Sequence, residues 1–413
     1  MKRYIRRLGY LCLLLSSLVQ ISLANDFSIT AFSGNGSISW ADTNTNGHYS
    51  IEWASTVGGP WRSDWFDLTQ IPATGGGITA QIPMFFRVLH KPLLSASANM
   101  VLVSGGGQLQ GPQYDFYMSK YEVTEEQFCA FLNNAQANTG NERGAYMWFD
   151  VNGDVYTHSN KTEIIFDISM SDFIYYKDNT LGTRYAIFYD SANNPITGVS
   201  WYGALKYCNW LTINEGRGIS QRCYSEGASG TNWFPANLTY ATWTDGFDNS
   251  ERMEWVQGWG GFRLPMSNYS TGASYFNEFY KAAAWNGYSN TVYAFGRNTL
   301  NGQDANYSGS GDPYETFSIP TTPIGYYDGT DHGGTFTTRS NANHYGIFDL
   351  SGNVTEWGSD AASSGNEGVN GSRVTFGGSY LDNSSGLRAN SPSSNQPYGR
   401  NALTGFRVCS SQP

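Results

Sequence analysis

Hydrophobic and polar residues alternate with a period of two along the first part of the chain. Five short runs follow this pattern and are separated by turn residues such as Gly58-Gly59-Pro60 and Gly75-Gly76-Gly77. Alternation between Gly- and Pro-rich breaks is typical of β-strands that bury one face. We therefore predict a small, all-β, sandwich-like module over residues 25–91. Residues 92–98, which contain Pro92 and several small side chains, are predicted to be a linker.

The pattern changes after residue 99, where helical spacing appears between short strands. Thr124 and Gln127 form a capping box that predicts a helix start, and apolar residues follow it at helical spacing to about Ala135. Ser200 precedes a second amphipathic stretch, and residues 277–285 predict a third helix. Turns and short strands dominate the remainder. The expected class is α+β with little regular secondary structure.

The N-terminal segment has the features of a secretory signal peptide. Lys2, Arg3, Arg6 and Arg7 precede an apolar stretch over residues 8–19, and Ser22-Leu23-Ala24 offers a small-residue cleavage site. The apolar part is too short to span a membrane comfortably, although an uncleaved anchor remains an alternative. We therefore predict removal of residues 1–24, export to a secreted, periplasmic or cell-surface location, and no transmembrane span after cleavage.

Composition narrows the classes of partner. The formal net charge is −10, and no basic run follows the first few residues, so nucleic acid is not an expected partner. Charged residues make up only 14% of the chain, whereas 48 Gly, 28 Tyr and 13 Trp favour a loop-rich fold with aromatic anchors. After signal cleavage four cysteines remain, which allow two disulfides in three connectivities or four buried thiols.

Residues 345–357, YGIFDLSGNVTEW, are the most specific stretch of the chain. Asp349, Gly352, Asn353 and Glu356 lie within eight positions and suit a tight loop that presents carboxylates and carbonyl oxygens to one point. Ca²⁺ prefers such oxygen ligands. The alternative is a turn whose polar side chains cap backbone groups without a metal.

Six further motifs occur in a fixed order around this stretch, and their sequences are YEVT at 121–124, GVSWY at 198–202, CNWL at 208–211, FRLP at 262–265, FGGSY at 376–380 and GFRVC at 405–409. This ordered set resembles the formylglycine-generating-enzyme family, also called the sulfatase-modifying-factor family. The resemblance covers residues 99–409, within a domain that we expect to occupy residues 99–413. It implies a divergent relative of the C-type lectin fold.

The resemblance also implies two structural calcium sites and one disulfide. The first site would use the side chains of Asp349 and Glu356 with the carbonyls of Gly352 and Val354. The family pairing of cysteines points to Cys208 with Cys409, although Cys409 comes one residue later than the family usually has it. The second site would use the side chains of Asn306 and Asp312 and the carbonyls of Tyr307 and Tyr314.

The catalytic signature of the family is missing. Its enzymes hold Cu(I) through two cysteines five residues apart, shortly after Gly-Gly-Ser, and here those positions are Asp382 and Leu387. Cu(I) requires soft thiolates, so copper is not expected. Thr355 also replaces a Trp at the active centre. The five histidines form no paired ligand motif for iron, which leaves Ser379, Asp382 and Arg388 as pocket candidates.

Three functions remain open at this point. The first is a non-catalytic module that binds a glycan, a peptide or an envelope partner through the groove that the family uses for substrate. The alternative is a divergent oxidoreductase that acts on a sulfatase or another protein. A third possibility is a structural surface protein assembled through the N-terminal module. The ligand and the oligomeric state are left undetermined by the sequence.

Overall fold

The computed structural model divides the chain into two compact units, Met1–Leu93 and Leu94–Pro413. The predicted signal peptide and the predicted linker, residues 92–98, lie outside the described residues. The structure describes six strands within residues 28–91 and then residues 99–137, 174–176, 185–187, 191–225, 234–239, 248–267, 272, 274–316, 320–334, 336–363 and 371–413.

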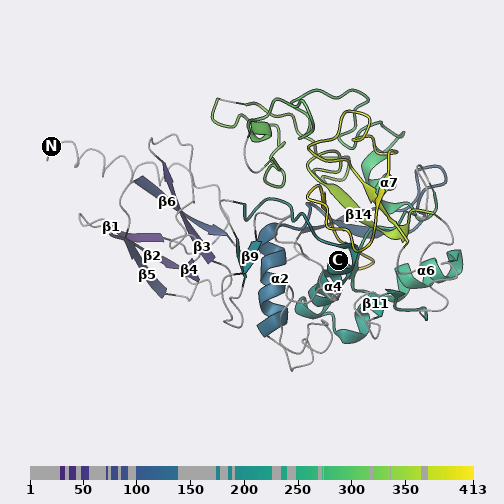
Figure 1. Cartoon of the computed structure of the whole chain (residues 1–413), viewed down its shortest axis with the longest axis horizontal. Coiled ribbons are helices and arrows are strands. Elements are labelled where there is room, and N and C mark those ends of the chain that lie inside the picture. Colours follow the sequence, from purple (N-terminus) through teal and green to yellow (C-terminus); the bar gives the residue numbers. More distant parts are fainter. Residues whose placement is uncertain are drawn as a thin grey trace. The chain divides into compact units, whose positions relative to one another are not determined.

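The N-terminal unit contains six strands in two three-stranded sheets, drawn in purple and blue in Figure 1. Ile38 and Trp40, on the central strand of the first sheet, are buried. Whether the two sheets pack as a sandwich stays a prediction. The first sheet has the order β1 (Ser28–Phe32), β2 (Ser37–Asp42), β5 (Gly76–Gln81), and the second has the order β4 (Ile71–Pro72), β3 (His48–Ala54), β6 (Phe85–Lys91).

The second unit is built on two four-stranded sheets. The first joins the two ends of the domain, because β18 pairs antiparallel with β8, and its order is β13 (Phe262–Arg263), β18 (Cys409–Ser410), β8 (Phe116–Ser119), β7 (Met100–Val103). The second has the order β16 (Ser393–Asn395), β15 (Arg373–Phe376), β14 (Thr355–Ala361), β17 (Thr404–Gly405). Two short pairs are β9 (Ile174–Tyr176) with β10 (Tyr185–Ile187) and β11 (Tyr224–Ser225) with β12 (Phe234–Pro235).

Three described helices of this unit lie where the sequence predicts them. Thr124 and Gln127 exchange the capping-box hydrogen bonds at the start of α2 (Glu125–Ala137), and Ser200 Oγ accepts from Gly203 N at the start of α4 (Trp201–Asn214). α7 (Glu278–Ala284) confirms the third predicted helix. α6 (Asn249–Gly258), with a capping box of its own, was not predicted. Two short 3₁₀ turns are η2 (Ile219–Gln221) and η3 (Pro313–Thr316). None of the helices described is long and apolar enough to span a membrane.

Buried tryptophans join the start of α4 to β14 through hydrogen bonds. Figure 1 labels both elements within the second unit. Trp201 Nε1 donates to the carbonyl of Gly358, and Trp357 Nε1 donates to the carbonyl of Val199. Both indoles are almost completely buried, so each needs the hydrogen bond that it makes. These reciprocal bonds hold the Trp357 end of the 345–357 segment against the core.

Buried ion pairs tie further motifs into this core. Arg263, from the FRLP motif, contacts both carboxylate oxygens of Glu278 at 2.5 and 2.6 Å. Arg252 on α6 pairs with Asp360 on β14. Since a buried ion pair that loses one partner leaves a charge uncompensated, each pair fixes the position of two distant segments.

The predicted disulfide between Cys208 and Cys409 is not formed in the structure. Cys129, Cys208, Cys223 and Cys409 are free thiols, and all four are buried. Burial raises the pKa of the Cys223 thiol to about 12, so this thiol stays protonated and unreactive at neutral pH. The structure thus has the buried-thiol arrangement that the sequence left as the alternative.

Candidate functional site

The 345–357 segment forms a tight loop that enters β14. Asp349 and Asn353 both adopt left-handed backbone conformations, with φ of 60° and 65°. Gly352 has φ of 94°, and a Cβ there would lie 2.5 Å from the carbonyl oxygen of Asn306. Only glycine fits this close approach of two backbones. The loop is therefore held in one strained conformation by its neighbours.

Glu356 does not stand free at the end of this loop. Its two carboxylate oxygens each lie 2.6 Å from the guanidinium of Arg407, one from Nε and one from Nη2. Arg407 also donates to the carbonyls of Ser119 and Phe348. Both side chains are fully buried, so this bidentate pair joins the 345–357 segment to the GFRVC motif.

Asp349 lies in the same buried region. Its carboxylate accepts from the backbone N of Gly325 at 2.6 Å and from Nδ2 of Asn341 at 2.8 Å. Burial raises the pKa of this carboxyl in spite of those bonds. Burial also raises the pKa of Glu356, although the charge of Arg407 opposes the shift.

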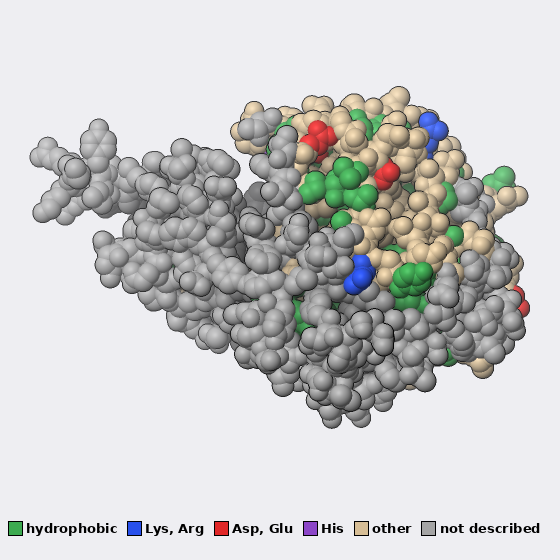
Figure 2. Space-filling model, viewed as in Figure 1, with side chains coloured by type: hydrophobic (Ala, Val, Ile, Leu, Met, Phe, Trp, Pro, Cys, Tyr) green, Lys and Arg blue, Asp and Glu red, His purple; other side chains and the backbone are tan. Residues whose placement is uncertain are grey.

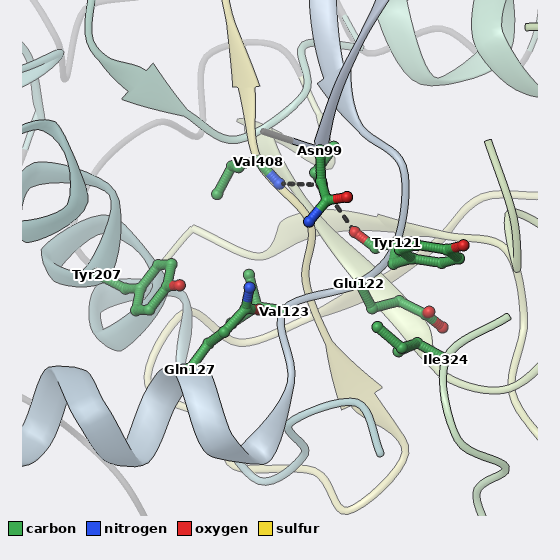
Figure 3. A pocket seen from close by; sticks show the side chains of 9 residues that line it. Asn99, Tyr121, Glu122, Val123, Gln127, Tyr207, Ile324 and Val408 are labelled. Carbon is green, nitrogen blue, oxygen red and sulfur yellow. Dashed lines mark hydrogen bonds between the residues drawn. The ribbon is translucent and has the colours of Figure 1, made fainter. Parts of the chain in front are cut away.

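A third carboxylate, Glu122 of the YEVT motif, completes the cluster. Burial raises its pKa well above the ordinary value, and the charge of Asp349 adds to the shift. Asn353 Nδ2 lies 3.3 Å from Glu122 Oε1, whereas Oε2 is buried without a hydrogen-bond partner. The Glu122 side chain lines a cavity of about 20 Å³, which has room for about one water molecule. Figure 3 shows this side chain between Tyr121 and Ile324.

The second predicted calcium set surrounds η3. Asp312 accepts hydrogen bonds from Ser310 Oγ, Tyr327 OH and Tyr314 N, at 2.7–2.8 Å. The Tyr307 carbonyl accepts from Ser310 N, and Asn306 Oδ1 is buried without a partner. The ligand atoms of this set are hard oxygens of the kind that Ca²⁺ prefers, and Asn306 Oδ1 has no hydrogen-bond partner. The residues therefore suit the ion chemically. Among the described residues, no cluster of three or more His, Cys, Asp or Glu side chains is arranged as a metal site.

The loop after Gly-Gly-Ser closes on itself. Ser379, which is fully buried, donates from both N and Oγ to Asp382 Oδ2, at 2.8 and 2.7 Å. Ser379 Oγ also lies 3.3 Å from the N of Leu381. No histidine contacts this pair among the interactions of the described residues, so the arrangement is a hydrogen-bonded turn rather than an activated nucleophile. Arg388, the third pocket candidate, is exposed at the surface.

Leu387 occupies a small apolar cluster. It is completely buried against Tyr293, Phe295 and Ala305, and the two aromatic rings stack at 5.4 Å. Its carbonyl accepts from Ser351 Oγ in the 345–357 segment at 2.9 Å. Asp382 and Leu387 thus stand where copper would need two thiolates, and neither side chain fits Cu(I).

Glu122 and Arg407 belong to the YEVT and GFRVC motifs, but the sequence analysis predicts no role for either residue. Glu122 and Arg407 meet the 345–357 segment from opposite ends of the domain, and their contacts span 231 and 51 positions of the chain. The signal that could have found them was their charge inside otherwise apolar motifs, because a charge in such a setting needs a partner.

The fold and these residues agree with the comparison against known families. The family model described as the sulfatase-modifying factor enzyme 1-like domain matches residues 89–412. The chain therefore belongs to this family, and its second unit has the formylglycine-generating-enzyme-like fold. No curated protein matches the chain.

Several solved structures are similar to this chain. A crystal structure of CarF is 22% identical, covers 75% of this chain and 97% of its own, and has a TM-score of 0.43. The variable protein 1 of Treponema denticola is 20% identical, with coverages of 81% and 98% and a TM-score of 0.41. PvdO from Pseudomonas aeruginosa is 15% identical, with coverages of 75% and 93% and a TM-score of 0.39. These values are too low to transfer a function.

Proposed function

We propose that this chain is an exported, non-catalytic binding protein of the sulfatase-modifying-factor family, with a domain related to the C-type lectin fold. The observation that carries the proposal is the state of the two cysteine positions. Asp382 is engaged by Ser379, and Leu387 is packed among aromatic side chains. Neither position offers the thiolate on which the oxidase chemistry of the family depends.

The binding surface that we propose is the exposed loop beside those positions. Leu381 has 63% of its side-chain area exposed, and Arg388 is exposed seven residues later. An exposed apolar side chain and an exposed cation on one loop can contribute to the binding of a peptide or a glycan without any chemical step. The ligand of this loop would be a protein, a peptide or a glycan.

Calcium belongs to the proposal as a structural ion. The set around Asn306 and Asp312 would hold one ion. At the predicted set of Asp349, Glu356 and the Gly352 and Val354 carbonyls, a second ion would have to replace the two bonds that Glu356 makes to Arg407. Support comes from the buried oxygen Asn306 Oδ1, which has no hydrogen-bond partner. We expect EGTA to lower the melting temperature, and Ca²⁺ but not Mg²⁺ to restore it.

An assay for cysteine conversion tests the absence of catalysis. The purified protein would be incubated with copper, a reductant, oxygen and a sulfatase peptide that carries the target cysteine, and mass spectrometry would follow the peptide. We expect the cysteine to stay unmodified. Formation of formylglycine would overturn the proposal and favour the divergent oxidoreductase.

A binding assay tests the other half of the proposal. Peptide and glycan arrays would be probed with the full chain and with the variants Leu381→Ala and Arg388→Ala, beside Ser384→Ala as an exposed control from the same loop. We expect binding that the first two variants weaken and the control keeps. Equal binding by all variants would exclude this loop as the surface.

A further inference from the structure

Two surface segments of the second unit are joined by hydrogen bonds, and we call the pair the platform. It consists of residues 105–113 and residues 285–290. Gln108 Nε2 donates to Asn290 Oδ1 at 2.6 Å, which joins the two segments directly. Lys281 Nζ, from α7, donates to the Gly106 carbonyl beneath them at 2.5 Å. The platform is therefore a single unit with a fixed shape.

The 285–290 segment is rigid in itself. Asn286 Oδ1 accepts from the backbone N of Tyr288 and of Ser289, at 3.0 and 2.9 Å, and Asn286 N donates to the Ser289 carbonyl. Trp285 and Asn290 form a β-bridge that closes the hairpin. An Asx turn inside a bridged hairpin leaves the backbone little freedom, so a ligand would not have to order it.

The platform carries the two most exposed large hydrophobic side chains among the described residues. Tyr288 has 93% of its area exposed and Leu109 has 84%. Trp285, which is half-buried, adds a contact between the two segments. Its ring lies next to Gly107, where an added Cβ would be 3.3 Å from it. A single exposed apolar residue needs no explanation, but two on adjoining rigid loops mark an interaction surface.

The polar side chains of the platform are amides together with the hydroxyl of Ser289, and none of them is charged. Neither segment includes Asp, Glu, Lys or Arg, while five of its fifteen residues are Gln or Asn. The adjoining Lys281 is buried and lies 4.9 Å from the centre of the Trp285 ring, and burial lowers its pKa to about 8. Among the residues drawn in colour in Figure 2, few side chains are charged.

We infer that the platform is a binding site for a neutral glycan. A sugar ring presents a face of C–H groups, which can stack on an exposed tyrosine, and an edge of hydroxyls, which can pair with amides. A partner with charge would find no counter-charge on either segment and would lose hydration without compensation. Neither segment contains a strand of a sheet, so they offer no sheet edge to which an extended peptide could add a strand.

This inference rests on the proposed binding function but concerns a different surface from the loop at Leu381. It adds the class of ligand, a neutral glycan, and names the aromatic anchor, Tyr288. Tyrosine is suited to this role because it buries a large amphipathic area at a small cost in side-chain entropy.

Native affinity electrophoresis in gels that contain a neutral polysaccharide tests the inference. The full chain would be run with a β-glucan, an α-glucan, a mannan or a xylan in the gel, beside Tyr288→Ala, Leu109→Ala and the control Tyr398→Ala. Tyr398 is also exposed, at 46%, but lies outside the platform. We expect at least one polysaccharide to retard the wild-type chain, and Tyr288→Ala to weaken that binding by at least about tenfold.

The remaining outcomes separate the two surfaces. Retardation that Tyr398→Ala and Tyr288→Ala reduce equally, or that Tyr288→Ala leaves intact, overturns the platform as a site. Loss of retardation only in Leu381→Ala would also overturn it while keeping the proposed function. No retardation by any of the four polysaccharides rejects the neutral glycan, and binding on a peptide array would still uphold the binding function. Melting temperatures of the variants, which we expect to match the wild type because these side chains are exposed, exclude unfolding as the cause.

Discussion

The 345–357 segment and the 377–388 loop lie side by side but are stabilised by different kinds of interaction. Gly352 N donates to the Gly377 carbonyl, and Ser351 Oγ donates to that of Leu387, so the two share a boundary. In the first, charged residues persist and form a buried network with Arg407. In the second, the positions that would carry the copper thiolates hold an apolar side chain and a turn-forming carboxylate.

The difference follows from what each region does for the fold. Glu356 has two oxygens bonded to Arg407, and any substitution that removes one partner leaves the other charged and buried. The 377–388 loop requires only that its turn be closed and that position 387 be packed. In this chain, substitutions that alter the chemistry of the loop are therefore expected to cost less stability than substitutions that break the network.

The largest expected effect comes from breaking the network. Arg407→Met removes the guanidinium and leaves Glu356, Asp349 and Glu122 without a counter-charge. We expect a loss of about 3–5 kcal/mol in the free energy of unfolding, the usual consequence of breaking a buried ion pair. Urea unfolding followed by tryptophan fluorescence measures it, with exposed Arg388→Met as a control that should change stability by less than about 0.5 kcal/mol.

The double variant Arg407→Met, Glu356→Met sharpens the first test. It removes both charges of the pair and replaces them with apolar side chains, so we expect it to recover much of the lost stability. A double variant as unstable as Arg407→Met alone would mean that the pair is not the main contribution of Arg407.

The packed position of the 377–388 loop gives the next largest effect. Leu387→Ala leaves a cavity in the cluster that contains Tyr293 and Phe295, and we expect a loss of about 2–5 kcal/mol. Leu381→Ala, at the exposed end of the same loop, should cost less than about 0.5 kcal/mol. If both variants unfold at the same urea concentration as the wild type, the loop does not pack as described here.

Helix starts could be predicted from neighbouring residues, whereas contacts between residues far apart in the chain could not. Thr124 with Gln127 and Ser200 lie within one turn of the groups that they cap, so sequence spacing alone reveals them. The partner of Glu356 lies 51 positions away and that of Glu122 lies 231 positions away, where no periodicity operates. α6 escaped prediction because its hydrophobic positions are few, although Asp248 and Glu251 form a capping box that could have marked it.

The pH dependence of stability gives a subtler test of the network. The pKa of Glu122 is raised in the folded state, so its stabilising contribution is fully present below the unfolded value of about 4.3 and is lost as pH rises through the folded pKa. We expect the wild type to lose stability from pH 5 to pH 8. Glu122→Gln cannot ionise, so it should lose less over that range. Parallel pH profiles, measured by thermal unfolding in EGTA, would contradict this account of Glu122.

The smallest effect is expected at the turn that Asp382 closes. Asp382→Ala removes the acceptor for Ser379 N and Oγ, which are buried, and leaves the rest of the loop unchanged. We expect a loss of about 1 kcal/mol, typical of a hydrogen-bonded pair that loses one member, against no change for exposed Ser384→Ala. Thermal unfolding of both variants measures the difference. Because the proposed role of Asp382 is structural, binding on peptide and glycan arrays should survive in the folded variant, and complete loss of binding at unchanged stability would instead make Asp382 a ligand contact.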